Sequence, residues 1–136
     1  MPPPPARRSP ELARLALIRV AMLAGVLTFG TVIWFLRRDG SPPLLGEAAD
    51  TLRLVGMVVG AVAVVGIAVF RTLASRAPEG GQRAAYSIVG WALGEAAALY
   101  GGVYYFLAGR PLGYMLGLML LLAAFVFIPV APRRRR

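Results

Sequence analysis

The sequence contains no cysteine, no histidine and no lysine, although it carries fifteen basic residues, all of them arginine. Without cysteine and histidine the chain has no disulfides and no thiolate or imidazole chemistry, and it lacks the common zinc and haem sites. Without lysine it cannot form a Schiff base. The serines, at positions 9, 41, 75 and 87, have no histidine or lysine to activate them. We therefore expect neither an enzyme, nor a metal site, nor a cofactor.

Acidic residues are also few, and the apolar residues are clustered. Six Asp and Glu stand against fifteen Arg, which gives a net charge of +9, and 58% of the residues are hydrophobic. That share exceeds the usual range of soluble domains, and the long apolar runs favour a membrane protein. The arginines flank these runs and do not form one basic face. The predicted partner is therefore a lipid bilayer with anionic headgroups, not nucleic acid.

Four apolar stretches predict an all-α membrane protein with four transmembrane helices, at residues 15–36, 54–70, 84–108 and 112–128. Each approaches or exceeds the roughly 17 residues that are needed to cross a bilayer. The predicted domains are a disordered Pro- and Arg-rich tail (1–14), a four-helix transmembrane domain (15–128) and a basic tail (129–136). Residues 44–53 form either a loop or a short amphipathic helix at the membrane surface.

The distribution of arginine predicts the orientation. Eleven arginines lie in the two tails, at the start of the first helix and in the loop between the second and third helices, whereas Arg37, Arg38, Arg53 and Arg110 lie on the opposite side. Because basic residues favour the cytoplasm, we expect a multi-pass protein of the inner (plasma) membrane with both termini cytoplasmic.

The carboxyl tail ends on four arginines, which are predicted to contact lipid headgroups: Arg133, Arg134, Arg135 and Arg136. Two interpretations are open. The arginines only fix the topology, or they also hold the carboxyl end against the inner leaflet, at about 1 kcal/mol for each Arg.

Small residues recur at steps of four on three of the predicted helices, a spacing that lets helix backbones approach closely. The predicted packing residues are Gly56 and Gly60 on the second helix, Gly90, Gly94, Ala98 and Gly102 on the third, and Gly113 and Gly117 on the fourth. The stripes serve packing within one chain, or they also join the chain to further copies or to a larger membrane complex. The sequence leaves both possibilities open.

Glu95 is the only charged residue between Ala84 and Ala108. A carboxyl group near the middle of a bilayer is unfavourable and therefore marks a candidate functional site. Neutralising an ordinary Glu at pH 7 costs about 3.7 kcal/mol. Placing a charge at the bilayer centre costs about 3 kcal/mol. Three interpretations are open: a protonated Glu that hydrogen-bonds another helix, a site that exchanges a proton or cation, and an interfacial Glu on a helix that is placed differently.

Few groups are available as partners for Glu95. Thr28 and Thr31 on the first helix are the predicted hydrogen-bond partners, provided that this helix packs beside the third. Arg19, near the cytoplasmic end of the first helix, is expected to extend towards the headgroups, as long basic side chains do. It is therefore not expected to act as a counter-ion.

Residues Val55 to Leu107 contain a Gly-rich helix, a polar loop with Arg76, Pro78 and Glu79, and a helix with Ala92-Leu93-Gly94-Glu95-Ala96-Ala97-Ala98-Leu99-Tyr100-Gly101. This hairpin resembles the proteolipid (c) subunit of rotary ATP synthases. The resemblance implies that Glu95 matches the embedded carboxylate that carries the proton, and that the loop faces the cytoplasm. It covers less than half of the chain. Over its whole length the chain resembles small uncharacterised bacterial membrane proteins with four helices, which implies no activity.

Two functional hypotheses follow. The first is a structural protein or an accessory subunit of a membrane assembly. The second is proton- or cation-coupled translocation through Glu95. The small multidrug-resistance transporters are also four-helix proteins with one embedded Glu, but that Glu lies on their first helix, so this likeness is one of architecture only. Asp39, Glu47 and Asp50 form either a cation-binding cluster on the outer side or, as we expect, part of a solvated loop.

Overall fold

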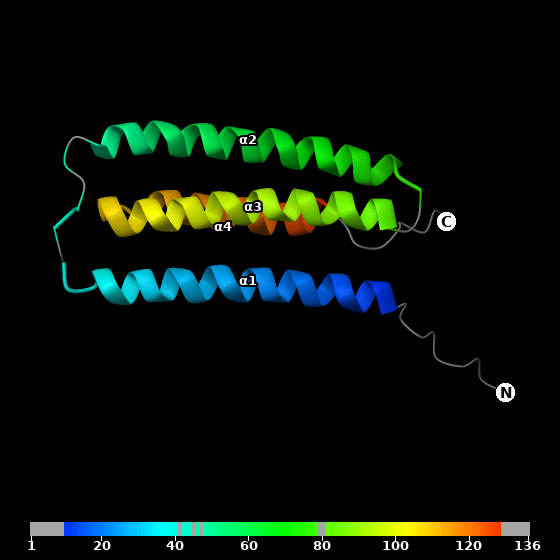
Figure 1. The fold of residues 1–136 in the computed structure, drawn as a ribbon, viewed down its shortest axis with the longest axis horizontal. Coiled ribbons are helices and arrows are strands. Elements are labelled where there is room, and N and C mark those ends of the chain that lie inside the picture. The colour runs from blue at the N-terminus through cyan, green and yellow to red at the C-terminus, as the bar shows by residue number, and fades with distance from the viewer. Residues whose placement is uncertain (1–9, 41, 45, 47, 79–80, 129–136) are drawn as a thin grey trace.

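A computed structural model describes residues 10–40, 42–44, 46, 48–78 and 81–128. In these residues the chain forms four α-helices and no strand: α1 (Pro10–Arg37), α2 (Ala48–Arg76), α3 (Gly81–Ala108) and α4 (Leu112–Phe127). Successive helices alternate in direction and lie side by side in an elongated bundle (Figure 1). The predicted all-α fold with four helices is therefore confirmed.

The central helix of the bundle is α3. It packs against the other three helices, most extensively against α4, whereas α1 and α2 lie on opposite sides of the α3–α4 pair (Figure 1). The connection between α3 and α4 is a tight turn. In it, Gly109 has a left-handed φ of 71°, and its N–H donates to the Tyr105 carbonyl oxygen over 2.9 Å. A left-handed residue after a helix favours glycine, because glycine has no Cβ to clash.

Glycines lie where the backbones of α3 and α4 approach each other. A Cβ added to Gly117 would lie 2.5 Å from the Cα of Ala98, and one added to Gly94 would lie 2.8 Å from the Cα of Leu121. Both distances are shorter than any ordinary contact between carbon atoms. Larger residues at these positions would therefore separate the two helices.

Two apolar clusters fill the space between the helices. One contains Leu15, Ile67, Ala74, Trp91, Ala124 and Ile128, and the other contains Val26, Ala98, Tyr114 and Leu121. The buried Tyr114 hydroxyl donates to the Val26 carbonyl oxygen over 2.9 Å. This hydrogen bond joins α4 to α1, a pair of helices that pack less extensively than α3 and α4 do.

The helices are longer than the apolar runs from which they were predicted. α1 begins at Pro10, so it includes residues 10–14 of the predicted tail; proline is favourable in the first turn of a helix because no partner is needed for its missing N–H. α2 continues past Phe70 to Arg76. The hydroxyls of Thr72 and Ser75 donate to the carbonyl oxygens of Ala68 and Thr72, so these polar residues remain helical.

Within the segment 44–53, residues 48–53 form the start of α2 and not a separate amphipathic helix. α2 itself starts at Ala48, and the Leu44 N–H donates to the Leu107 carbonyl oxygen over 2.9 Å. This bond ties the segment to the end of α3. The tail from residue 1 to residue 9 and the arginines at 133–136 lie outside the described residues, and the predictions for them remain predictions.

Two helices are long and apolar enough to cross a membrane, by length and composition. They are the segment Leu12–Arg37 of α1, whose most apolar 18-residue window has a mean hydropathy of 2.0, and α2, whose corresponding window has a mean hydropathy of 2.4. α4 is apolar but has only 16 residues. α3 contains polar and small residues, and several of its side chains are buried against the other helices.

Candidate functional sites at Glu95 and between α2 and α4

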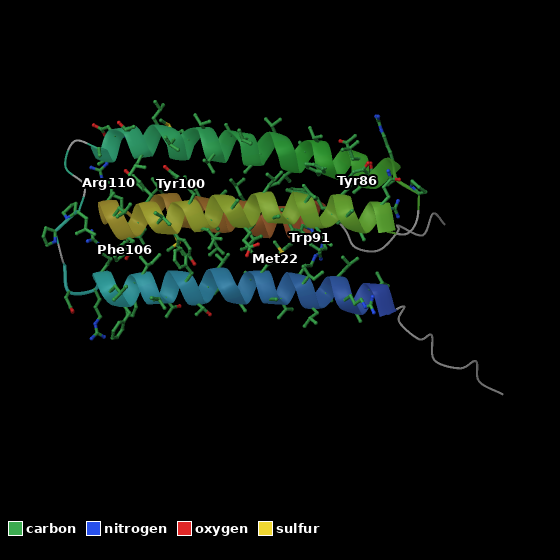
Figure 2. The ribbon with its side chains drawn as sticks, in the orientation of Figure 1. Met22, Tyr86, Trp91, Tyr100, Phe106 and Arg110 are labelled. Carbon is green, nitrogen blue, oxygen red and sulfur yellow. The ribbon has the colours of Figure 1, made fainter. Side chains whose placement is uncertain are left out.

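Glu95 lies half-buried near the middle of α3. By helical spacing it shares a face with Trp91, Ala98 and Gly102. That face is turned towards α1, because the Arg19 guanidinium lies over Trp91 and the Phe29 ring lies against Gly102. Figure 2 shows Trp91 and Met22 in the space between α3 and α1. The carboxyl group is therefore on the α1 side of α3, not on the α2 side.

Neither of the threonines predicted as partners reaches Glu95. Thr28 and Thr31 are both exposed, and the Thr31 hydroxyl donates over 2.8 Å to the Leu27 carbonyl oxygen of its own helix. Within the described part of the chain Glu95 forms no hydrogen bond and no ion pair. The expectation that α1 packs beside α3 holds, but the threonines point elsewhere.

Arg19, which was expected to extend towards the headgroups, contacts the carboxyl end of α4. The expected contact with headgroups remains a prediction. The Arg19 Nη2 donates to the Phe125 carbonyl oxygen over 2.9 Å and to the Ile128 carbonyl oxygen over 2.6 Å. The last carbonyls of a helix have no partner within the helix, so the end of α4 attracts a donor. The guanidinium also lies 4.3 Å from the ring centroid of Trp91 and 5.5 Å from that of Phe125.

The Arg19 cluster is thus formed by Arg19, Trp91, Phe125 and Ile128, from three helices. Trp91 is fully buried, and its ring meets that of Phe125 edge to face at 5.8 Å. The Trp91 Nε1 and the Arg19 Nε are buried without a hydrogen-bond partner among the described residues. The sequence did carry one signal of this cluster, since an arginine inside an apolar helix is rare and usually has a specific partner.

A second feature, which sequence reasoning missed, is a groove of about 880 Å³ between α2 and α4, with α3 as its floor. The residues that line it are Leu52, Arg53, Gly56, Met57, Gly60 and Val64 from α2, Ala97, Tyr100, Gly101 and Tyr104 from α3, and Arg110, Leu112, Gly113, Leu116, Gly117, Met119, Leu120 and Ala123 from the α3–α4 turn and α4. We call it the α2–α4 groove. It has no acidic residue in its lining and is mostly apolar.

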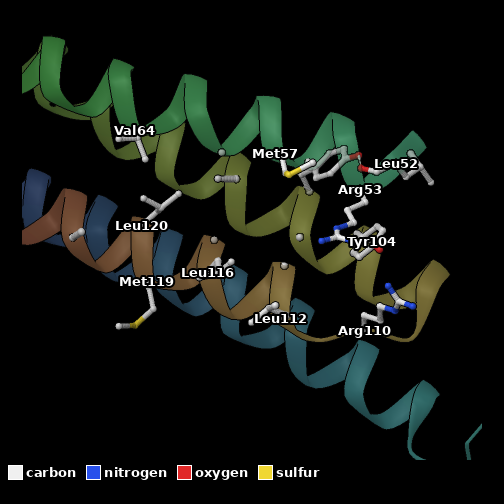
Figure 3. A pocket seen from close by; sticks show the side chains of 18 residues that line it. Leu52, Arg53, Met57, Val64, Tyr104, Arg110, Leu112, Leu116, Met119 and Leu120 are labelled. Atoms are coloured by element: carbon white, nitrogen blue, oxygen red, sulfur yellow. Dashed lines mark hydrogen bonds between the residues drawn. The ribbon is translucent and has the colours of Figure 1, made fainter. Parts of the chain in front are cut away.

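One end of the α2–α4 groove is positively charged. Figure 3 shows Arg53, Tyr104 and Arg110 together at this end, with Val64 and Leu120 far from it along the groove. Within the described residues neither arginine forms an ion pair. The sequence had placed both arginines on the same side of the membrane but could not place them beside one cavity, because they flank different helices.

The predicted packing residues lie at several different contacts between the helices. Gly94, Ala98 and Gly117 lie at the α3–α4 contact. Gly90 lies near Phe70 and Ile128, Gly102 faces Phe29 of α1, and Gly56 lies beneath the Tyr100 ring. Gly56, Gly60, Gly113 and Gly117 line the α2–α4 groove, and at Gly60 an added Cβ would meet nothing within 4 Å.

Other predicted features of the outer side are not brought together. Asp39 and Asp50 are exposed, and Asp39 lies 3.6 Å from Arg38. Glu47 lies outside the described residues. No group of three or more acidic, His or Cys side chains with metal-binding geometry occurs in the part of the chain that the structure describes.

The chain matches no protein-family model, and no curated protein and no solved structure is similar to it. The α2–α3 hairpin does have the antiparallel arrangement that the likeness to a proteolipid subunit implies. That likeness nevertheless remains a resemblance of residues 55–107 alone, and it carries no function to this chain.

Proposed function

We propose that this chain is a small integral membrane protein whose four helices all cross the bilayer, and that it acts as a structural or accessory component of a membrane assembly. The observation that supports this most is the outward position of its apolar side chains. Leu17 and Val20 of α1 are 69% and 65% exposed, and Val65 of α2 is 63% exposed. Continuous apolar surface of this kind is unfavourable in water and favourable in lipid.

The two outer helices, α1 and α2, have most of their apolar surface outside the protein core. Only 17% of the most apolar window of α1 and 11% of that of α2 is buried inside the protein. The core helix of a soluble protein has the opposite pattern, with its apolar residues facing inward. α3 needs less hydrophobicity than α1 and α2, because the other helices separate much of its surface from lipid.

The short α4 fits this proposal through Arg19. Sixteen residues extend about 24 Å, less than the hydrocarbon thickness of about 30 Å. The carboxyl end of α4 then lies within the membrane, where unpaired carbonyl groups are costly. The Arg19 guanidinium donates to two of those carbonyls, which makes a helix end favourable at that depth.

The orientation in the proposal has both termini in the cytoplasm, from the excess of arginine on that side. Because the natural chain has no cysteine, single-Cys variants can test it directly. Asp39→Cys and Pro111→Cys are expected to react with a membrane-impermeant maleimide on intact cells. Ser75→Cys is expected to react only after permeabilisation. Labelling of Pro111→Cys and Ser75→Cys from the same side would contradict four crossings.

A structural or accessory role is supported by the tight α3–α4 packing and by the lack of an activated nucleophile or base in the sequence. Translocation of a proton or cation through Glu95 is the second candidate. A half-buried carboxyl group with no ion-pair partner in the described residues favours it. Glu95 forms no hydrogen bond to another polar side chain among the described residues, which favours the structural role.

One experiment separates these candidates. Wild type and Glu95→Gln are reconstituted in liposomes, and proton uptake is followed under an imposed gradient. We expect no uptake above empty liposomes for either protein. Uptake by wild type that disappears in Glu95→Gln would establish translocation in place of the structural role. Labelling of Glu95 by a hydrophobic carbodiimide across pH, with Glu95→Gln as the blank, reports whether the carboxyl is accessible from lipid.

A further inference from the structure

The α2–α4 groove has the length of one bilayer leaflet. Along α2 the lining extends from Leu52 to Val64, a rise of about 18 Å, and along α4 from Leu112 to Ala123, a rise of about 16 Å, at about 1.5 Å per residue. Half of the hydrocarbon core is about 15 Å thick. The rims are exposed, since Met57 and Met119 are 56% and 66% exposed. In the proposed topology the groove therefore opens sideways into lipid.

The two ends of the groove differ. Beyond Val64 the Leu93 side chain of α3 lies against Gly66, and the Arg71 guanidinium lies 5.4 Å from the ring centroid of Phe127, so side chains occupy the space at this end. The other end remains open and carries Arg53 and Arg110 (Figure 3). An occupant is therefore apolar along its length and anionic at one end.

A second copy of this chain fits the groove less well. A symmetric contact places the same surface of both copies face to face. Four arginines, two from each copy, would then meet at one depth with no acidic lining residue between them. An anionic headgroup has the opposite effect, because guanidinium groups bind phosphate oxygens with paired hydrogen bonds.

We propose that the α2–α4 groove binds one phospholipid of the outer leaflet whose headgroup is anionic. An acyl chain lies along the Gly56–Gly60 side of α2, over Gly117 of α4, and the headgroup phosphate lies between Arg53 and Arg110. The Tyr104 hydroxyl is positioned to donate to the same headgroup. This inference rests on the proposed membrane location and adds a lipid ligand to it.

The test uses the purified full-length protein in detergent and compares phosphatidylglycerol with phosphatidylcholine of identical acyl chains. Native mass spectrometry gives the number of bound lipids and the apparent Kd of each. We expect one tightly bound phosphatidylglycerol. The double variant Arg53→Gln/Arg110→Gln is expected to weaken its binding about 30-fold and to abolish the preference over phosphatidylcholine. The matched control Arg37→Gln/Arg38→Gln removes two charges from the same side, outside the groove, and is expected to change Kd less than threefold.

A second pair of variants tests the apolar part of the site. Gly60 lines the groove and an added Cβ meets nothing within 4 Å there, so the side chain of Gly60→Leu is expected to extend into the groove. We expect it to reduce bound lipid of both kinds at least tenfold. Ala61→Leu, on the neighbouring exposed position, is the control and is expected to bind as wild type does. Wild-type binding by Gly60→Leu would overturn the proposal, as would equal effects of the two arginine pairs.

The remaining outcomes are also decisive. Glycerol phosphate and inorganic phosphate, added at the lipid concentration, are expected not to compete, because they lack the acyl chain; full competition by either would make this a site for free anions. A dimer in wild type that becomes a monomer in Gly60→Leu would assign the groove to a second copy. Failure of the maleimide topology test with lipid binding intact would remove the proposed topology without removing the site.

Discussion

The guanidinium of Arg19 lies over the ring of Trp91, 4.3 Å from its centroid, while Nη2 of the same side chain donates to two carbonyl oxygens at the end of α4. One side chain of α1 thereby contacts both α3 and the end of α4. Its contacts combine charge-assisted hydrogen bonds with a cation–π interaction, both of which strengthen away from water.

Removal of Arg19 is therefore expected to destabilise the bundle. Arg19→Met keeps the apolar part of the side chain but leaves two carbonyls at the end of α4 without their donor, and we expect a loss of about 2–3 kcal/mol of unfolding free energy. Arg19→Lys is expected to lose less, because one hydrogen bond can remain. The measurement is denaturation in mixed detergent micelles, followed by circular dichroism.

The control for this variant is Arg14→Met, at an exposed position that lies five residues earlier in the same helix. Its effect is expected to stay within about 0.5 kcal/mol, as for most surface substitutions. Equal destabilisation by the two variants would mean that Arg19 contributes through overall charge and not through the end of α4.

The two tryptophans provide a separate optical test of the Arg19 cluster. Trp91 is fully buried, whereas Trp34 is 58% exposed. In Trp34→Phe the remaining Trp91 is expected to be shielded from aqueous acrylamide, and the added Arg19→Met change is expected to shift its emission because the cation over the ring is removed. In Trp91→Phe the remaining Trp34 is expected not to respond to Arg19→Met. A response from Trp34 would show a general change in folding.

The positions of the helices follow from the sequence more directly than their ends and contacts. Continuous apolar runs specify helices in a chain with so few turn residues inside those runs. The end of α2 was missed because Thr72 and Ser75 resemble loop residues, whereas their hydroxyls donate within the helix. The role of Arg19 was missed because its partners lie 106 and 109 residues away in the sequence.

For the candidate sites, too, the sequence predicts the position of a residue in a helix but not its contacts with other helices. Glu95 is visible as a lone charge in an apolar run, so its position in a helix could be predicted from the sequence alone. Its orientation towards α1 depends on which face of α3 each neighbouring helix covers. The small residues do not predict this, because they occur on all faces of α3. The lining of the α2–α4 groove includes Gly56 and Gly60 of α2 and Gly113 of α4, two helices that only the packed structure brings together.

Larger side chains at the contact between α3 and α4 are expected to destabilise the protein. Gly117→Val adds side-chain atoms where even a Cβ would lie 2.5 Å from the backbone of Ala98. Backbone atoms cannot move aside as a flexible side chain can, so we expect a loss of at least about 1–3 kcal/mol, the usual range of overpacked cores. The variant's unfolding is measured as for Arg19→Met.

Gly25→Val is the matched control for Gly117→Val, because Gly25 is exposed on α1 and an added Cβ meets nothing within 4 Å. Both variants make the same substitution in a helix and differ only in what surrounds it. A similar loss of stability for both would trace the effect to the valine in the helix and not to the α3–α4 contact.

The unfolding free energy of Glu95 variants tests whether the Glu95 carboxyl forms a hydrogen bond to another helix. A hydrogen bond between membrane helices contributes about 0.6 kcal/mol on average and up to about 1.7 kcal/mol. Because Glu95 has no hydrogen-bond partner in the described residues, we expect Glu95→Leu to leave the unfolding free energy unchanged or to raise it, since a half-buried polar group is replaced by an apolar one. Glu95→Gln should behave as wild type does. A loss of more than about 1 kcal/mol of unfolding free energy in Glu95→Leu, with no such loss in Glu95→Gln, would identify a hydrogen bond from residue 95 to another helix. Glu95 would then be a residue that holds two helices together.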